Sequence, residues 1–113
     1  MNSNIESPKV GDGAAAIAQL AFTLLQNNRF EDAAVLLDAL ADIGASTPRT
    51  LAMLALARLR MGQPHEALQI LDDIAAQEND FSPCHLIRAQ ALVSLGQRAA
   101  ARASMHRFLA TQS

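Results

Sequence analysis

The chain has 113 residues, the length of a single domain, half of them apolar, and a formal net charge of −2 at pH 7. Four Phe and no Trp or Tyr are present, and the Ala- and Leu-rich remainder of the apolar set favours packed helices over a sheet. An acidic balance with so few aromatic rings argues against nucleic-acid binding, and no apolar run reaches the ~20 residues that span a bilayer. We therefore expect no nucleic-acid partner and no stable membrane insertion.

The N-terminal segment, residues 1–13, reads "MNSNIESPKVGDG" and is polar. It lacks the charged start and apolar centre of a secretory signal, and the lone Cys84 cannot form an internal disulfide. We expect these residues to be a disordered tail and the protein to be cytoplasmic.

From Ala14 onward the sequence matches itself at a shift of 34 residues. The stretch "MGQPHEALQIL" at 61–71 returns as "LGQRAAARASM" at 95–105. The shift predicts one domain of three repeats over residues 14–111, with copies at 14–47, 48–81 and 82–111.

Each copy is predicted to begin with a helix, because its matched residues recur at i, i+3, i+4 and i+7 on one helical face. These columns are Ile17/Leu51/His85, Leu20/Leu54/Arg88, Ala21/Ala55/Ala89 and Leu24/Arg58/Leu92. A turn column then ends the helix with the residue types that most easily adopt a left-handed backbone, namely Asn28, Gly62 and Gly96.

A second helix follows in each copy, with columns Ala33/Ala67/Ala101, Leu37/Leu71/Met105 and Leu40/Ile74/Phe108. Pro48 and Pro83 mark the start of the next copy, since a helix tolerates Pro in its first turn. Small residues at two positions per copy predict close packing of antiparallel helices, which a bulkier residue would disrupt: Ala21, Ala33, Ala55, Ala67, Ala89 and Ala101.

These small residues, the large apolar residue four positions later and the 34-residue period resemble the tetratricopeptide repeat. The predicted fold is an all-α solenoid of three tetratricopeptide-like hairpins with about six antiparallel helices. The sequence departs from the family pattern at its usual aromatic position, occupied by Ile17, Leu51 and His85, and at Arg88, where Leu is usual.

No sequence feature predicts chemistry. GxGxxG, GxxxxGK[ST], GxSxG, CxxC and HxxxH are absent, and the adjacent Cys84 and His85 would point in different directions on a helix. The acidic pairs at 31–32 and 72–73 are interpreted as solvated faces. We expect a non-enzyme without catalytic residues, metal or cofactor.

The resemblance implies that the first helix of each repeat lines a concave groove. Its predicted residues are Ala18, Phe22, Leu25, Gln26, Arg49, Ala52, Leu56, Leu59, Arg60, Leu86, Gln90 and Val93. An exposed apolar patch of this extent favours a binding site for an amphipathic helix or an extended apolar segment. The alternative, a tightly closed array in which these residues are ordinary core, stays open.

The C-terminal end is predicted to lack the polar capping helix that usually ends such an array. Met105, Phe108 and Leu109 would then be uncapped, and another copy or a bound partner could cover them. Residues 1–80 carry eleven acidic and five basic residues, a net −6, whereas residues 81–113 carry four Arg and no acid. This asymmetry could also pair one copy with the next.

The phrases "AAVLLDALADI", "HLIRAQALVSLGQ" and "ARASMHRFLA" resemble the small tetratricopeptide chaperones of bacterial type III secretion, most closely the SctY group. The resemblance implies a partner similar to SctX, a small secreted protein, held as a heterodimer or larger complex until export. A chaperone of the needle subunit, or a co-chaperone of that system, is one alternative. A non-chaperone adaptor or self-assembling scaffold is another, and a homodimer of the free protein is left open.

Overall fold

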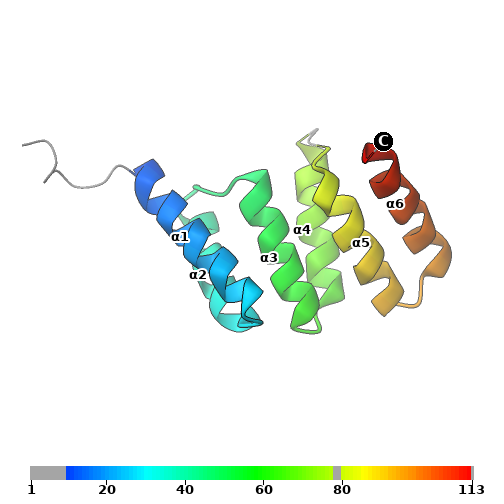
Figure 1. The fold of residues 1–113 in the computed structure, drawn as a ribbon, viewed down its shortest axis with the longest axis horizontal. Coiled ribbons are helices and arrows are strands. Elements are labelled where there is room, and N and C mark those ends of the chain that lie inside the picture. The colour runs from blue at the N-terminus through cyan, green and yellow to red at the C-terminus, as the bar shows by residue number, and fades with distance from the viewer. Residues whose placement is uncertain (1–9, 78–79, 113) are drawn as a thin grey trace, which may run out of the picture.

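The described chain, residues 10–77 and 80–112 of a computed structural model, is a row of helical hairpins. The described residues form six helices and no strand: α1 (Val10–Gln26), α2 (Phe30–Asp42), α3 (Pro48–Arg60), α4 (Pro64–Ala76), α5 (Ser82–Ser94) and α6 (Arg98–Thr111). Figure 1 shows them running from α1 at one end to α6 at the other. The predicted all-α solenoid of three hairpins is confirmed.

The three hairpins turn in the same way. Asn28, Gly62 and Gly96 all have a positive φ, at 60°, 78° and 75°, the conformation that the turn column predicts. In each turn the backbone N–H three residues past the last residue of the helix reaches back five residues to a carbonyl oxygen, which satisfies a group that the helix leaves unpaired. These bonds are Arg29 to Leu24 at 2.8 Å, Gln63 to Arg58 at 2.9 Å and Gln97 to Leu92 at 2.9 Å.

The helix starts follow from Pro and from one side-chain cap. Pro lies in the first turn of α3, α4 and α5. Before α3, the Thr50 N–H donates to Thr47 Oγ1 at 3.1 Å and the Thr47 N–H donates to Thr50 Oγ1 at 2.8 Å, which forms a reciprocal capping box. Helices α3 and α5 begin at Pro48 and Ser82, where the sequence places the second and third repeats.

The first helix begins earlier than the sequence indicates. Helix α1 starts at Val10, so residues 10–13 belong to it and not to the expected tail. The prediction of disorder for residues 1–9 lies outside the described residues.

The core forms between neighbouring hairpins. A first cluster joins α1 and α2 to Met53, Leu54 and Ala57 of α3, and a second joins α3 and α4 to Cys84 and Ile87 of α5. All six small residues of the predicted packing columns are buried: Ala21, Ala33, Ala55, Ala67, Ala89 and Ala101. Close approach of the paired helices therefore leaves no room for larger side chains.

Ion pairs cross both junctions between repeats. Arg58 of α3 reaches Asp38 of α2 at 2.6 Å, and Arg88 of α5 reaches Asp72 of α4 at 2.9 Å. Asp38 and Asp72 are 34 residues apart, so the same repeat position accepts an arginine from the following hairpin twice. Arg58 and Arg88 lie in different columns of the repeat, one helical turn apart. Aligning the repeats therefore does not reveal that both pair with the same aspartate position.

Candidate functional site

The predicted groove residues lie on α1, α3 and α5 and differ widely in exposure. Ala18, Phe22, Leu56, Leu59, Leu86 and Gln90 are half-buried, whereas Gln26, Arg49, Arg60 and Val93 are exposed. Leu25 and Ala52 are buried, with only 9% and 3% of their surface exposed.

Leu25 and Ala52 correct the predicted groove. Leu25 belongs to the first core cluster and Ala52 to the second, so neither presents its side chain to a partner. Leu56 and Leu59 pack against the second cluster. For Leu25 and Ala52 the closed-array alternative is correct, whereas Leu56 and Leu59 keep part of their surface exposed.

Exposure rises along one column of the repeat. Leu25 of the first copy is buried, Leu59 of the second is half-buried, and Val93 of the third is 62% exposed. The same repeat position therefore changes from core to surface, since the first two hairpins have a following hairpin and no further helix follows α6 in the described residues.

One open pocket lies at the N-terminal end of the array, between α1, the α2–α3 loop and the start of α3. Its volume is about 610 Å³, and it brings the predicted Ala18 and Arg49 together with Ala14, Ala15, Ile43 and Thr50. The Arg49 guanidinium carbon lies 5.7 Å from the centre of the Phe22 ring, a cation–π contact that covers one face of the ring. Sequence reasoning missed Ile43, an exposed apolar residue in the loop, because it belongs to no repeat column.

A second open pocket lies between α5 and α6 and has a volume of about 410 Å³. We call it the α5–α6 seat and define it by Gln90, Val93, Arg98, Ala101, Arg102 and Met105. Gln90 and Val93 were predicted for the groove and Met105 for the uncapped end. Of the other two residues predicted for the uncapped end, Phe108 is half-buried and Leu109 is 55% exposed.

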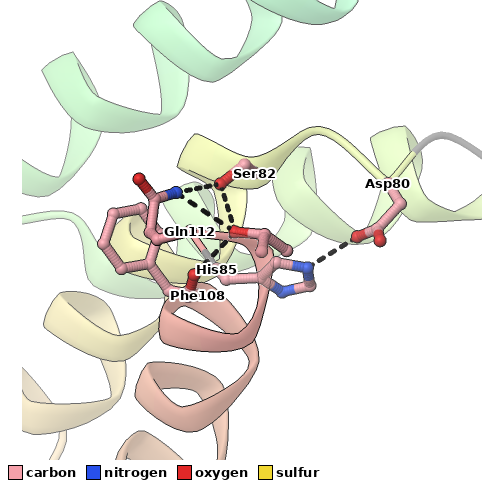
Figure 2. A network of polar contacts seen from close by, with 6 residues as sticks. Asp80, Ser82, His85, Phe108 and Gln112 are labelled. Atoms are coloured by element: carbon pink, nitrogen blue, oxygen red, sulfur yellow. Dashed lines mark hydrogen bonds and ion pairs between the residues drawn. The ribbon is translucent and has the colours of Figure 1, made fainter.

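The far end of α6 is tied to the start of α5 by polar contacts, as Figure 2 shows. The Thr111 and Ser82 hydroxyl groups lie 2.7 Å apart, and Gln112 Nε2 donates to Ser82 Oγ at 3.2 Å. These contacts join the two helices of the third hairpin at the end opposite its turn.

The titratable groups near α5 are engaged in structural contacts. His85 Nε2 lies 2.6 Å from Asp80 Oδ1, and burial raises the pKa of the Cys84 thiol, with Arg88 lowering it and Asp80 raising it further. A protonated thiol is a weak nucleophile and a poor metal ligand. No group of three or more His, Cys, Asp or Glu side chains in the described part of the chain could hold a metal ion.

What this geometry offers is binding surface: α1, α3 and α5 lie in a row, and open pockets lie near both ends of that row. The fold and the surface define a tetratricopeptide-like helical-repeat protein. A family model described as anaphase-promoting complex, cyclosome, subunit 3 matches residues 17–108, and the chain belongs to this family.

The solved structures include a similar fold. The crystal structure of PcrH in complex with the chaperone binding region of PopB matches with a TM-score of 0.80 at 20% sequence identity, over 94% of this chain and 85% of PcrH. No curated protein sequence matches the chain significantly. Among the described residues, no helix is long and apolar enough to cross a membrane.

Proposed function

We propose that this protein is a cytoplasmic chaperone of a bacterial type III secretion system, which binds an apolar helical segment of a small secreted partner. Its shared fold with PcrH, whose structure holds the chaperone binding region of PopB, is the observation that carries the proposal. The resemblance of three sequence phrases to the SctY group supports a partner similar to SctX.

The proposed contact surface is the concave face of α1, α3 and α5. After the correction for Leu25 and Ala52, its remaining predicted residues include the half-buried Phe22, Leu56, Leu86 and Gln90 and the exposed Arg49. Each Å² of apolar surface that a partner covers contributes about 25 cal/mol before ordering costs, so a handful of apolar anchors supports a stable complex.

Leu86 is the sharpest position at which to test this surface. It is half-buried on α5 and lies outside both core clusters as described, whereas Leu56 and Leu59 pack against the second cluster. Leu86→Glu should therefore remove partner binding without unfolding the chain. The matched control is Leu20→Glu, because Leu20 is a leucine of α1 that is 52% exposed and lies outside the predicted groove.

The experiment is co-expression of each variant with the SctX-like protein and, separately, with the needle subunit of the same system, followed by affinity purification at low and high salt. We expect wild type and Leu20→Glu to retain the SctX-like protein at both salt concentrations, since apolar contacts are screened little. Leu86→Glu should lose at least about tenfold of the retained partner, equivalent to roughly 1.4 kcal/mol. Equal retention by all three proteins, with unchanged circular dichroism, would refute the assignment of the surface.

If only the needle subunit is retained, the protein is a chaperone of that subunit and not of the SctX-like protein. Self-association that disappears at high salt, with neither protein retained, would favour a scaffold. The internal pairing of Arg88 with Asp72 already removes one of the four C-terminal arginines from the charge available for such stacking.

A further inference from the structure

The α5–α6 seat corresponds, residue by residue, to two sites that helices of this chain already fill. A shift of 34 residues carries its six residues onto Leu56, Leu59, Pro64, Ala67, Leu68 and Leu71 of α3 and α4. A shift of 68 carries them onto Phe22, Leu25, Phe30, Ala33, Ala34 and Leu37 of α1 and α2. The open pocket is therefore a third copy of one recurring helix-binding surface.

The two filled copies show what this surface binds. Helix α3 packs Met53, Leu54 and Ala57 against the first copy, all within the first core cluster. Helix α5 packs Cys84 and Ile87 against the second copy, within the second cluster. In both cases the occupant is a 13-residue helix that presents small and medium apolar side chains.

The third copy differs from the other two in charge. The first copy has Phe30 and Ala34, and the second has Pro64 and Leu68, at the positions where the α5–α6 seat has Arg98 and Arg102. All four residues of the earlier copies are uncharged. In the seat, Arg98 and Arg102 are charged, and both are exposed.

A second difference in charge lies one helical turn further along α2, α4 and α6. Asp38 and Asp72 each accept an arginine from the helix that follows, but the equivalent residue of α6 is His106. His106 lies four residues after Arg102, so the two side chains occupy the same face of α6. A stacking helix that carried Arg where Arg58 or Arg88 lies would face Arg102 and His106 in place of a carboxylate. A carboxylate on that helix would instead be attracted to Arg102.

A second copy of this chain fits the seat poorly. Its α1 would present Gln19, Leu20 and Thr23, the equivalents of the inserted Met53, Leu54 and Ala57. Only Leu20 is apolar, and none of the three carries a carboxylate. Charge and shape therefore both favour an occupant other than this chain's own first helix.

We propose that the α5–α6 seat binds an amphipathic helix of a partner protein, which stacks as α3 and α5 do and places a carboxylate against Arg102 and His106. The occupant has small or medium apolar side chains on its inner face. This site lies beyond the proposed function, because the helix would extend the row of hairpins; of the predicted groove residues, Gln90 and Val93 also line the seat. Its test does not involve the secreted partner.

The test uses the 113-residue protein and two fluorescently labelled peptides with the sequence of α5, residues 82–94. Both carry Cys84→Ala to prevent disulfide formation, and both are held helical by a cross-link between positions 86 and 90, opposite the inserted face. One retains Arg88 and the other carries Arg88→Glu. Because the chain's own α5 occupies the second copy of the surface, the seat is the copy open to a peptide.

Fluorescence anisotropy should show that the Arg88→Glu peptide binds about three- to fivefold more tightly than the Arg88 peptide, the range of one exposed ion pair. In the Arg102→Glu variant of the protein this preference should reverse. Arg107→Glu, an equal charge change on a different face of α6, should leave the preference as in wild type. Met105→Glu should weaken both peptides at least about tenfold, because it places a charge in the apolar floor of the seat.

Three outcomes would overturn the proposal. The first is that neither peptide binds, and the second is that both bind with affinities that Arg102→Glu and Met105→Glu leave unchanged. The third is a dimer of the free protein, measured by sedimentation, that Met105→Glu dissociates, since a second copy would then be the occupant. Circular dichroism of each variant must match wild type for these readings to apply.

Discussion

The hairpin turns depend on one residue each, whose backbone is left-handed. Gly62 and Gly96 have φ values of 78° and 75°, and a Cβ at either position would meet no atom within 4 Å. Glycine is therefore favoured at these positions by the left-handed backbone and not by a lack of space for a side chain. Asn28 adopts the same conformation with φ of 60°, because Asn is the side chain that tolerates it best.

At Gly62 this reasoning predicts different outcomes for two substitutions. Gly62→Ala should lower the free energy of unfolding by about 1 kcal/mol, since the left-handed backbone is strained for Ala. Gly62→Asn should cost clearly less, because Asn28 already occupies the equivalent position of the first turn. Urea denaturation of both variants measures the difference, and equal losses would show that packing and not backbone conformation governs this turn.

Among the helix starts that the structure describes from α2 to α6, that of α3 has a side-chain cap. Thr47 and Thr50 satisfy each other's backbone N–H groups, and Thr50 is itself buried. The caps of α2, α4, α5 and α6 have no side-chain hydrogen bond. Since α3 packs against both α1 and α2 in the first cluster, its start determines how the first two repeats meet.

We predict that Thr47→Ala lowers the free energy of unfolding by about 1 kcal/mol, the usual effect of losing a side-chain cap. Thr47→Ser keeps the hydroxyl oxygen and should cost only a few tenths of a kcal/mol. Thermal or urea unfolding followed by circular dichroism measures both. Equal stability of Thr47→Ala and wild type would mean that Pro48 alone defines the start of α3.

At the scale of the whole molecule, contacts between hairpins in the part of the chain that the structure describes join neighbours only. Among the described residues, the first hairpin contacts the second through α1–α3 and α2–α3, the second contacts the third through α3–α5 and α4–α5, and the first does not contact the third. The radius of gyration is 15.7 Å, above the roughly 13 Å of a compact domain of this length. Stability is therefore close to a sum of hairpin and junction contributions.

This arrangement predicts a gradient of local stability. Helix α3 packs against α1, α2, α4 and α5, whereas α6 packs against α5 alone. Backbone amides in the centre of α3 should exchange with deuterium roughly tenfold or more slowly than those in the centre of α6. Uniform protection across the helices, measured by mass spectrometry, would indicate a single cooperative unit.

The sequence predicted the repeat but could not predict which member of a column is exposed. Pro48, the turn column and the six packing alanines act within one hairpin, so their roles follow from local spacing. Leu25 and Val93 share a column, yet one is core and the other surface, because burial depends on the neighbouring hairpin. The start of α1 at Val10 was missed for a similar reason, since the repeat gives no signal before Ala14.

The absence of contact between the first and third hairpins has a mechanical consequence. Two junctions join the hairpins, the first through α1–α3 and α2–α3 and the second through α3–α5 and α4–α5, and we expect the shape of the row to depend on the angle at each. A rigid ligand that touches all three first helices must fix both angles. We therefore expect the half that binds first to restrict the angle available to the second half, which would couple binding along the row.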